Sequence, residues 1–549
     1  MSNSKVNYFE NCRQKLLRHL AVTDRVEEIS KQFSSLSSNT ERVRFVYDLL
    51  DGADLFPAFA EDLKNDDTAM EYRKKGNDMF KIKNNQAALV FYTKCIAHAE
   101  ENSESLAIAY ANRSAVLMEG GYFKECLEDI ANALSNSYPE KLKPKLLGRK
   151  EKCQEVIHSQ KTPLYHQRIP HIPEKSRNKH ITCASDSVKI KDSDDLGKHV
   201  VATKDIQLGD IIAIEEPFSH ILVGEYTSHC RGCLQLCFNL IPCQNCTKAL
   251  YCSISCKDKA RSYHQYECKL LKTFVTLGMD KMKMLPLKIA ITVKDIHDKI
   301  RNTDFMENGE YRSDRYQEIH NLVDNQDKRS MSDVFGRCIT ASIIYHLMKL
   351  ISFFTTDDEE ETFLLVLLKH LQTAPCNFHQ IFDFVERKGT VEIGAGAYSF
   401  LSMFNHSCSP NVVRQCYGST NVLRAIRSIR AGEQLFDNYG YHYAVEPKES
   451  RRTSLREQYF FECSCEACEQ DWPLYSSLPD LGVEALDFLS LERLTRGDVG
   501  YAQEILEQVL EAARKMEEPQ PNKQFAELQE AAKQCFLLIG NFVKDPIMQ

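Results

Sequence analysis

Cysteine and histidine residues recur at short, regular intervals between positions 230 and 268, and this spacing constrains the fold more than any other feature of the chain. They form four pairs, each separated by two or three residues, with the members Cys230, Cys233, Cys243, Cys246, Cys252, Cys256, His264 and Cys268. Eight such ligands suffice for two tetrahedral zinc ions, because thiolate and imidazole suit Zn²⁺. So short a segment has little apolar material for a core, so the metal must supply the folding energy. Buried thiols without metal are the alternative interpretation.

The remaining composition favours a folded intracellular protein. Of the 549 residues, 43% are hydrophobic and 21 are cysteines, which is enough material for three or four domains. The first residues lack the apolar segment of a signal peptide, so we expect a reducing compartment in which cysteines bind metal rather than form disulfides. No apolar run approaches about eighteen residues, which predicts no membrane span. The chain has no decisive nuclear-import run, and we expect it in nucleus and cytoplasm.

A second constellation lies in the C-terminal half. The stretch Asn405-His406-Ser407-Cys408 is followed, about thirty residues later, by a strand pattern that ends in Tyr439, and then by the cysteines Cys463, Cys465 and Cys468. Each motif alone is weak, but in this order they resemble the SET-domain protein-lysine methyltransferases. The paired cysteines further upstream resemble the MYND zinc finger. A SET domain split by such a finger is similar to the SET-and-MYND-domain family, over about residues 188–470.

This resemblance implies methyl transfer from S-adenosylmethionine to a lysine of a histone or non-histone protein. Tyr439 matches the catalytic tyrosine, whose hydroxyl orients the lysine amine, and a phenol of ordinary pKa near 10 is no strong general base. The residues that the resemblance places around the cofactor are Lys198, Ser402, Met403, Asn405, His406, Tyr439 and Phe461. Tyr398 and Tyr441 either wall the lysine channel or pack in the core. Tyr316 matches a further cofactor contact.

One position departs from the family pattern. His199 replaces the second glycine of the family's Gly-x-Gly cofactor loop. A side chain there hinders the approach of the backbone to the cofactor, unless the φ angle of His199 is strand-like.

The resemblance also implies how the zinc ligands are shared. The finger pairs interleave, with Cys230, Cys233, Cys252 and Cys256 on one ion and Cys243, Cys246, His264 and Cys268 on the other. The three late cysteines lack a fourth ligand, and the resemblance assigns Cys408 to them, which gives three zinc ions in all. A free thiol cluster is the alternative for this third set.

The patterns together predict an α+β multidomain fold in which a β-rich SET domain is split by the finger and a helical insert, and is flanked by α-helical, tetratricopeptide-like regions. The predicted segments are an N-terminal helical region (1–68), tetratricopeptide-like repeats (69–158), a linker (159–182), the first part of the SET domain (183–228), the finger (229–269), a helical insert (270–392), the catalytic part of the SET domain (393–444), a post-SET zinc segment (445–473) and a C-terminal helical region (474–549).

Two internal similarities support this division. Gly76 and Ala88, and later Ser114 and Ala133, occupy the small positions of the tetratricopeptide pattern, where paired helices cross closely. A generic stack of helical hairpins without a ligand is the alternative. The pattern between residues 202 and 212 recurs at the same spacing between residues 425 and 435. It predicts two hairpins of one interrupted β-domain, unless shared turn chemistry produces the match.

The finger and the repeats predict protein partners, because such fingers bind peptides and stacked helix pairs present a concave face to an extended chain. Four polar residues either clamp an acidic peptide end or form an ordinary solvated face: Lys74, Lys75, Asn112 and Arg113. Basic residues in the finger allow weak, salt-sensitive contact with DNA: Lys248, Lys257, Lys259, Arg261, Lys269 and Lys272. The net charge of −8 argues against a generic nucleic-acid binder.

Three functions compete. The first is an S-adenosylmethionine-dependent protein-lysine methyltransferase, favoured by the intact Asn405, His406 and Tyr439. The second is a scaffold or transcriptional co-regulator that keeps the methyltransferase fold but acts by binding. The third, a zinc-dependent hydrolase, is disfavoured because the predicted ligands close all three metal sites and leave no coordination position for water.

Overall fold

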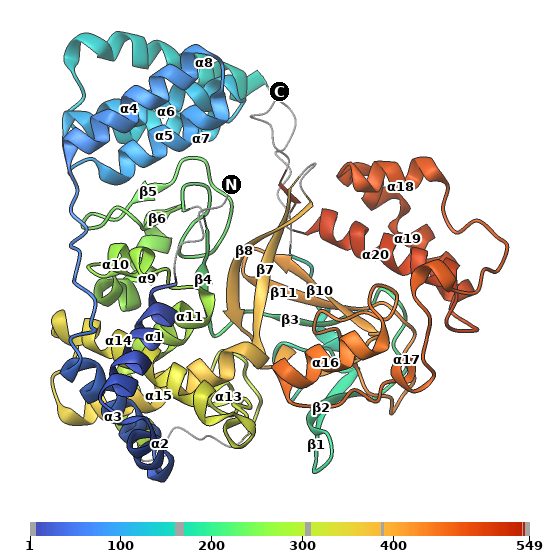
Figure 1. Ribbon diagram of the computed structural model, residues 1–549. Coiled ribbons are helices and arrows are strands. Elements are labelled where there is room, and N and C mark those ends of the chain that lie inside the picture. The colour runs from blue at the N-terminus through green and yellow to red at the C-terminus, as the bar shows by residue number, and fades with distance from the viewer. Residues whose placement is uncertain are drawn as a thin grey trace.

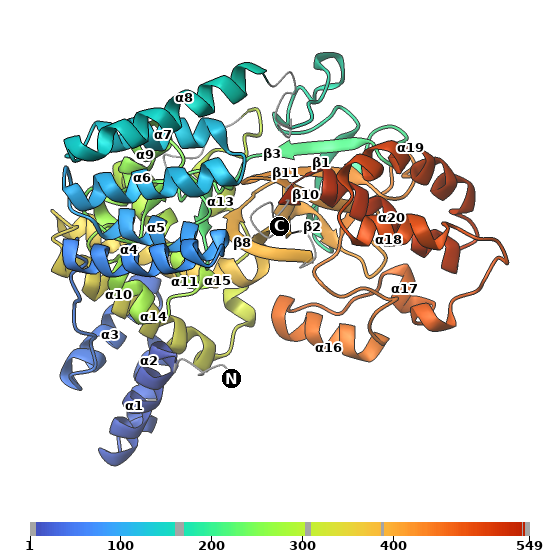
Figure 2. The same ribbon diagram turned by 90° about the horizontal axis from the view of Figure 1, so that it is seen from above.

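The computed structural model describes residues 7–159, 169–224, 226–301, 309–385, 389–540 and 542–543. Strands occupy the centre of the molecule in Figure 1, with a large helical half on one side and a smaller group of C-terminal helices on the other. In both views α4–α8 lie over the zinc-finger segment (Figures 1 and 2). None of the helices in the described ranges is both long and apolar enough to cross a bilayer.

The predicted repeat region is a stack of consecutive helices: α4 (Asp66–Lys81), α5 (Asn85–His98), α6 (Glu104–Glu119), α7 (Phe123–Leu134) and α8 (Lys143–Ser159). The side chains of Asn65, Asn84 and Ser103 accept backbone N–H groups at the starts of α4, α5 and α6, which fixes where these helices begin. Gly76 must be small, because a Cβ atom there would lie 2.6 Å from the ring of Tyr92. The close crossing predicted from the small residues is therefore present between α4 and α5.

The repeats are docked on the finger rather than standing free. The Arg113 guanidinium donates to both carboxylate oxygens of Asp129 at 2.8 Å and to the backbone oxygen of Leu240, in the finger, at 2.9 Å. Thr247 of the finger donates its N–H and its hydroxyl to Asp62, both at 2.8 Å. Arg113 is fully buried, so neither prediction for it, a peptide clamp or a solvated residue, is right. It lies on the side of α6 that faces α7 and the finger.

The other three polar residues of that prediction differ from Arg113. Lys74 and Lys75 are exposed, and Asn112 is half-buried. The Asn112 amide donates to Asn77 Oδ1 at 3.2 Å, and Asn77 also accepts the hydroxyl of Tyr92 at 2.9 Å. Asn112 is thus part of a small polar network between α4, α5 and α6, whereas the two lysines are exposed.

The N-terminal helices share a core with the helical insert. The first of these are α1 (Tyr8–Val22), α2 (Val26–Ser35) and α3 (Asn39–Gly52), and α1 and α3 pack against α14 (Met331–Leu350). Val43, Val46 and Leu50 are buried in this core, and the Ser342 hydroxyl donates to the backbone oxygen of Val43 at 3.0 Å. The described part of the N-terminal region is therefore built into the insert.

The helical insert is shorter than its predicted range of 270–392. Its helices are α10 (Leu271–Thr276), α11 (Lys281–Thr292), α12 (His297–Arg301), α13 (Tyr316–His320), α14 and α15 (Asp357–Asn377). From Phe378 the chain forms strands β7 (Phe378–Val385) and β8 (Gly389–Ala397), because aromatic and β-branched residues there favour a pleated surface.

The SET portion consists of several small sheets. Strands β1 (Val188–Ser193) and β2 (Gly197–Ala202) form a hairpin, and a second sheet has the order β10 (Val412–Tyr417), β11 (Thr420–Ala425) and β3 (Ile211–Glu215). A third sheet has the order β13 (Phe542–Val543), β7, β8 and β4 (Ser219–Leu222). The short strand β9 (Asn405–His406) pairs in parallel with β12 (Phe436–Asp437). Ile206 bridges to Ile429, and the Gly432 N–H donates to the Ala202 oxygen at 2.9 Å. The two similar hairpins therefore pair with each other in one interrupted β-domain, as predicted.

The finger and the C-terminal region complete the fold. The finger contains β5 (Ile241–Pro242), β6 (Leu250–Tyr251) and α9 (Ile254–Glu267), and the chain after the SET strands contains α16 (Lys448–Tyr459), α17 (Glu466–Glu469), α18 (Phe488–Thr495), α19 (Val499–Met516) and α20 (Lys523–Ile539). The last three helices pack on the SET sheets through Leu208 and Ile426, which share a core with Val509 and Phe525.

Candidate active site and metal clusters

Seven of the eight residues predicted to contact the cofactor line one cavity of about 590 Å³, and Tyr316 is the exception. These residues come from four separate stretches, at the start of β2, in the turn before β9, after β12 and after α16, and they are Lys198, Ser402, Met403, Asn405, His406, Tyr439 and Phe461. The fold therefore gathers into one space what the sequence spreads over more than two hundred positions.

The turn that carries Ser402 and Met403 is held by a buried carboxylate. Glu215, at the end of β3, accepts the N–H groups of Phe400 and Leu401, each at 2.9 Å. The side chain is completely buried, and burial raises its pKa to about 8, while the N–H groups act in the opposite direction. We did not identify Glu215 from the sequence, because it lies 185 positions before its partner Phe400.

The short strand β9 fixes the two polar residues of the central motif. Asn405 donates its side-chain amide to the Leu196 oxygen at 3.3 Å, which ties it to the loop before β2. His406 Nδ1 accepts the N–H of Tyr439 at 3.1 Å, so this nitrogen carries no proton. Burial lowers the pKa of His406 to about 4, in agreement with a neutral ring.

Tyr439 lies in the wall of the cavity with its hydroxyl engaged. The hydroxyl donates to the Phe404 oxygen at 2.9 Å, and burial raises its pKa well above the usual value. The phenol is therefore protonated at neutral pH, and its oxygen remains available as an acceptor. A second tyrosine, Tyr459, also lines the cavity, and its ring centroid lies 4.7 Å from that of Tyr439. It was not predicted, although it stands only two positions before Phe461.

The departure at His199 creates no obstruction. His199 belongs to β2 and does not share the positive φ of Gly197, which is +60°. Its ring nitrogen Nδ1 donates to the Gly197 oxygen at 2.8 Å, so the side chain is held beside the loop. His199 therefore has the strand conformation in which its side chain does not hinder the approach of the backbone to the cofactor.

The three other tyrosines considered do not line this cavity. Tyr398 is fully buried and donates its hydroxyl to the Ser419 oxygen, which fits the core-packing alternative. Tyr441 bonds to Gln458 Oε1 at 3.3 Å. The hydroxyl of Tyr316 is 3.1 Å from Nε2 of His370, so the match of Tyr316 to a cofactor contact is not reproduced.

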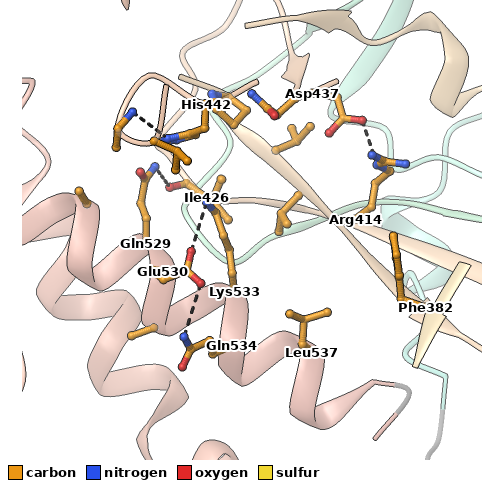
Figure 3. A pocket seen from close by; sticks show the side chains of 18 of the residues that line it. Phe382, Arg414, Ile426, Asp437, His442, Gln529, Glu530, Lys533, Gln534 and Leu537 are labelled. Carbon is orange, nitrogen blue, oxygen red and sulfur yellow. Dashed lines mark hydrogen bonds and ion pairs between the residues drawn. The ribbon is translucent and has the colours of Figure 1, made fainter. Parts of the chain in front are cut away.

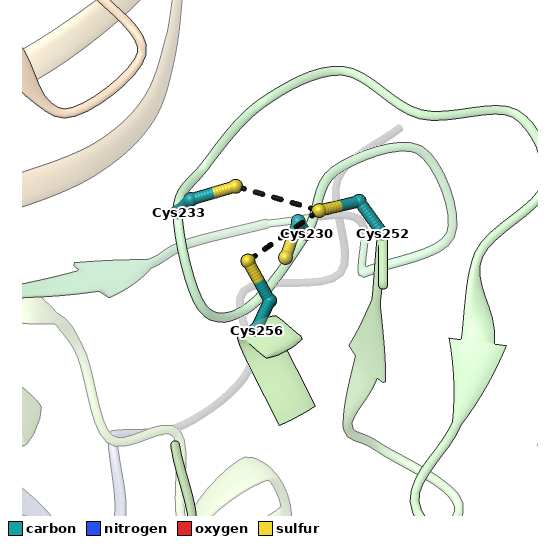
Figure 4. A group of neighbouring side chains, drawn as sticks. All are labelled: Cys230, Cys233, Cys252 and Cys256. Atoms are coloured by element: carbon teal, nitrogen blue, oxygen red, sulfur yellow. Dashed lines mark hydrogen bonds between the residues drawn. The ribbon is translucent and has the colours of Figure 1, made fainter. Parts of the chain in front are cut away.

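Three groups of four ligand atoms are brought together, each with its atoms within 4.8 Å of one another. The first finger group is Cys230, Cys233, Cys252 and Cys256, drawn in Figure 4. The second is Cys243, Cys246, His264 and Cys268, and the third joins Cys408 to Cys463, Cys465 and Cys468. These are the same groupings that the family resemblance implies. Cys237 belongs to none of them.

The surroundings of the clusters have the features of metal sites. In the second group, His264 Nε2 lies 3.2 Å from Cys243 Sγ, while Nδ1 lies 3.2 Å from a carboxylate oxygen of Glu267. Glu267 is in turn paired with Arg231 at 2.9 Å. A carboxylate behind a ligating histidine fixes which nitrogen faces the metal.

The third cluster has a cation beside it. Arg451 is fully buried and donates to Cys468 Sγ at 3.5 Å. The Cys408 N–H donates to Cys465 Sγ at 3.3 Å. Four thiolates around one Zn²⁺ carry a net negative charge, so a buried guanidinium and a backbone N–H directed at sulfur suit such a site.

A second cavity, of about 730 Å³, lies between the SET strands and α20 (Figure 3). Apolar residues such as Phe382, Ile426 and Leu537 form much of its lining, and its charged groups are Arg414, Asp437, Glu527, Glu530 and Lys533. Phe436 lines the first cavity, whereas its neighbour Asp437 lines the second. Strand β12 therefore separates the two spaces.

Comparison with known proteins agrees with this architecture. The family model described as SET domain matches residues 197–440. The chain contains a SET domain. Protein-lysine N-methyltransferase SMYD4 of Danio rerio is 27% identical over 506 residues, covering 74% of this chain and 66% of that protein. N-lysine methyltransferase SMYD2 of Homo sapiens is 26% identical over 275 residues, covering 50% of this chain and 58% of that protein.

The chain spans about two thirds of the length of the first of these relatives. Among solved structures, the SET domain of LSMT bound to lysine and AdoHcy superposes with a TM-score of 0.25 at 14% identity, covering 64% of this chain and 84% of that chain. A score this low carries no argument.

Proposed function

We propose that this chain is a protein-lysine N-methyltransferase that uses S-adenosylmethionine as methyl donor. One observation carries the proposal: a single cavity in a SET domain gathers Lys198, Asn405, His406, Tyr439 and Phe461 from segments far apart in the sequence. The similarity to named protein-lysine methyltransferases supports the same reaction. A scaffold without catalysis would not need these side chains in one space.

The reaction is a displacement in which a neutral lysine amine forms the N–C bond while the methyl–sulfur bond breaks. S-adenosylmethionine supplies an electrophilic methyl group on a cationic sulfur, and that charge also lowers the pKa of a nearby ammonium. Tyr439 holds its hydroxyl proton toward Phe404, so its oxygen accepts from the amine and orients it. The proton of the substrate ammonium leaves to solvent, because the protonated phenol is no base.

The substrate segment is placed in the cavity on the far side of β12. Asp437 and Asn438 line that cavity while Tyr439 lines the other, so a lysine passing beside this strand reaches Tyr439 from the side opposite the cofactor. The mixture of apolar wall and charged groups suits a peptide side chain and its neighbours. We therefore assign the peptide to the second cavity and the methyl donor to the first.

The three clusters are proposed as zinc sites, each closed by four ligands and therefore structural. Zinc at the third site would join the Asn405–Cys408 stretch to the segment that carries Phe461. No step of the reaction passes through a metal.

Arg113 joins the repeats to the finger, and Thr247 joins the finger to Asp62 in the segment before α4, so we assign protein partners to surfaces away from these contacts. Two of the basic residues considered for DNA contact are engaged within the protein, which argues against that contact. Lys272 donates to the Glu61 oxygen at 2.9 Å, and the Lys248 amine lies over the ring of Tyr226. Residence in nucleus and cytoplasm remains our proposal.

The test is methyl transfer from isotopically labelled S-adenosylmethionine to lysine-containing protein substrates, with Tyr439→Phe as the comparison. This variant should keep cofactor affinity and lose transfer by roughly a hundredfold, because the amine is no longer held in line. Failure of the native chain to bind S-adenosylmethionine would remove the proposal, and full activity of Tyr439→Phe would remove the role of that residue.

A further inference from the structure

Arg414 lines the second cavity and contacts side chains of two other strands, β12 and β7. It lies on β10, and its Nε is 2.9 Å from a carboxylate oxygen of Asp437, an ion pair drawn in Figure 3. Its Nη1 is 2.7 Å from Nδ1 of His379 on β7. The carboxylate of this ion pair is buried, since Asp437 is 5% exposed, whereas the Arg414 side chain is partly exposed. One guanidinium therefore connects three different strands.

The contact with Arg414 determines the tautomer of His379. A guanidinium has only donors, so Nδ1 of His379 must accept and carries no proton. The ring proton is then on Nε2, which lies 3.3 Å from Ser402 Oγ and donates to it. Burial, followed by the charge of Arg414, lowers the pKa of His379 well below its ordinary value, which keeps the ring neutral.

Ser402 completes a chain of hydrogen bonds in which Arg414 donates to His379, His379 donates to Ser402, and Ser402 donates to a backbone carbonyl. Its Oγ lies 2.7 Å from the Tyr398 oxygen and 2.8 Å from the Asn377 oxygen, and both are pure acceptors. The Ser402 hydroxyl therefore donates to a backbone carbonyl, and its oxygen accepts the hydrogen bond from Nε2 of His379. Ser402 lines the cofactor cavity, so the chain from Arg414 ends at the reaction space.

The other end of the network holds the strand of Tyr439. Strand β12 is only two residues long and pairs with β9 through Phe436 and Asp437. So short a pairing leaves few backbone bonds to define the position of Tyr439, two residues further on. The carboxylate of Asp437 gives the same strand a second attachment, through Arg414, to β7 and β10.

We propose that Arg414 is a positioning residue for methyl transfer, holding the strand that carries Tyr439 in register with the turn that carries Ser402. This inference rests on the proposed function, since it concerns the same reaction. Its signature is a loss of turnover without a matching loss of cofactor affinity, because Arg414 itself does not line the cofactor cavity.

The experiment compares Arg414→Met with the double variant Arg414→Met/Asp437→Asn. The single change leaves a buried carboxylate without its cation and is expected to destabilise the fold. The double change removes both charges, so it tests the loss of positioning without the destabilisation that an unpaired buried carboxylate causes. Arg424→Met is the matched control: Arg424 lies on the neighbouring strand β11, where it donates to the Gly209 oxygen at 3.1 Å and packs on Phe536.

Three quantities are measured on each variant: kcat at saturating S-adenosylmethionine, the affinity for S-adenosylhomocysteine by calorimetry, and the ¹⁵N chemical shifts of His379, assigned with His379→Gln. In the double variant, kcat should fall about tenfold or more, as a small displacement of reacting groups commonly costs. Affinity should change by less than about threefold, and the His379 ring should lose its fixed tautomer. The control should behave as the native chain does.

Native kcat in the double variant below its melting temperature would overturn the inference, whatever its stability. An unchanged His379 spectrum would overturn the hydrogen-bond chain. These results differ from failure of the proposed function, in which the native chain itself would show no transfer.

Discussion

Cys468→Ser offers the sharpest test of how the third cysteine cluster supports the active site. Cys468 is sixty positions after Cys408 but their sulfur atoms lie 3.5 Å apart. Replacing one thiolate by a hydroxyl removes a ligand from a closed four-ligand site, so we expect this variant to lose one zinc ion and to keep the two of the finger. The change lies outside the cofactor cavity, since Cys468 does not line it.

The expected loss of cofactor affinity follows from what the cluster holds. Cys408 is two residues after His406, and Cys463 is two residues after Phe461, whose ring centroid lies 6.2 Å from that of His406. Disturbing the support of a metal site commonly costs about tenfold to a hundredfold. That range corresponds to about 1.4–2.8 kcal/mol.

The loss should not exceed this range, because the same stretch has supports that need no metal. The Ser407 N–H donates to the Asp437 oxygen at 2.9 Å, and Glu215 holds the turn before it through two hydrogen bonds. Asn405 and His406 also pair with β12. These contacts keep part of the cavity in place after the cluster is opened.

The assay combines S-adenosylhomocysteine titration with zinc counting on the same sample. Cys535→Ser is the matched control, because Cys535 is an equally buried thiol of α20 that belongs to no cluster. Native cofactor affinity in Cys468→Ser after loss of one zinc would refute the coupling. Retention of all zinc would refute Cys468 as a ligand.

Three further predictions concern other parts of the chain. Purified protein should contain about three zinc ions per chain, and metal analysis that gives only two would remove the Cys408 site. Arg113→Met should lower the free energy of unfolding by about 3–5 kcal/mol, because Asp129 stays buried without its cation; Arg113→Met/Asp129→Leu should recover much of this in urea unfolding, and equal losses would contradict the ion-pair reasoning. Burial lowers the pKa of Lys288 to about 7, so the folded state binds fewer protons than the unfolded chain between about pH 7 and 10.4. Stability should therefore rise with pH across that window, by at most about 1.4 kcal/mol per pH unit, and Lys288→Met should flatten the slope.

The sequence was sufficient wherever the relevant residues are near neighbours or belong to a recognisable order. The finger ligands lie within 39 positions, from Cys230 to Cys268, and their spacing alone predicts metal binding. The seven cofactor-cavity residues followed from family resemblance, and the cavity contains them all. The paired hairpins around Ile206 and Ile429 could be predicted because the same sequence pattern occurs twice.

What the sequence did not show depends on contacts that no local pattern encodes. Glu215 looks like any acidic residue at a strand end until the fold sets it against Phe400. Arg113 looks like a solvated arginine on a helix, but the fold buries it between Thr93, Asp129 and the Leu240 oxygen of the finger. The strands from Phe378 onward were taken into the helical insert, because a short apolar run does not distinguish strand from helix by periodicity.

The contact between repeats and finger has a consequence for how the protein is made. Leu240 stands three residues before Cys243 and Thr247 directly follows Cys246, so the surface on which the repeats dock is shaped by loops that the metal ligands close. During translation α4–α8 emerge before those loops exist, with Arg113 and Asp129 facing an absent partner. If zinc closes these loops, as we propose, the repeats can acquire their final place only after the finger has bound metal. On this proposal, a shortage of zinc would also disturb α4–α8, whose described residues contain no cluster of metal ligands.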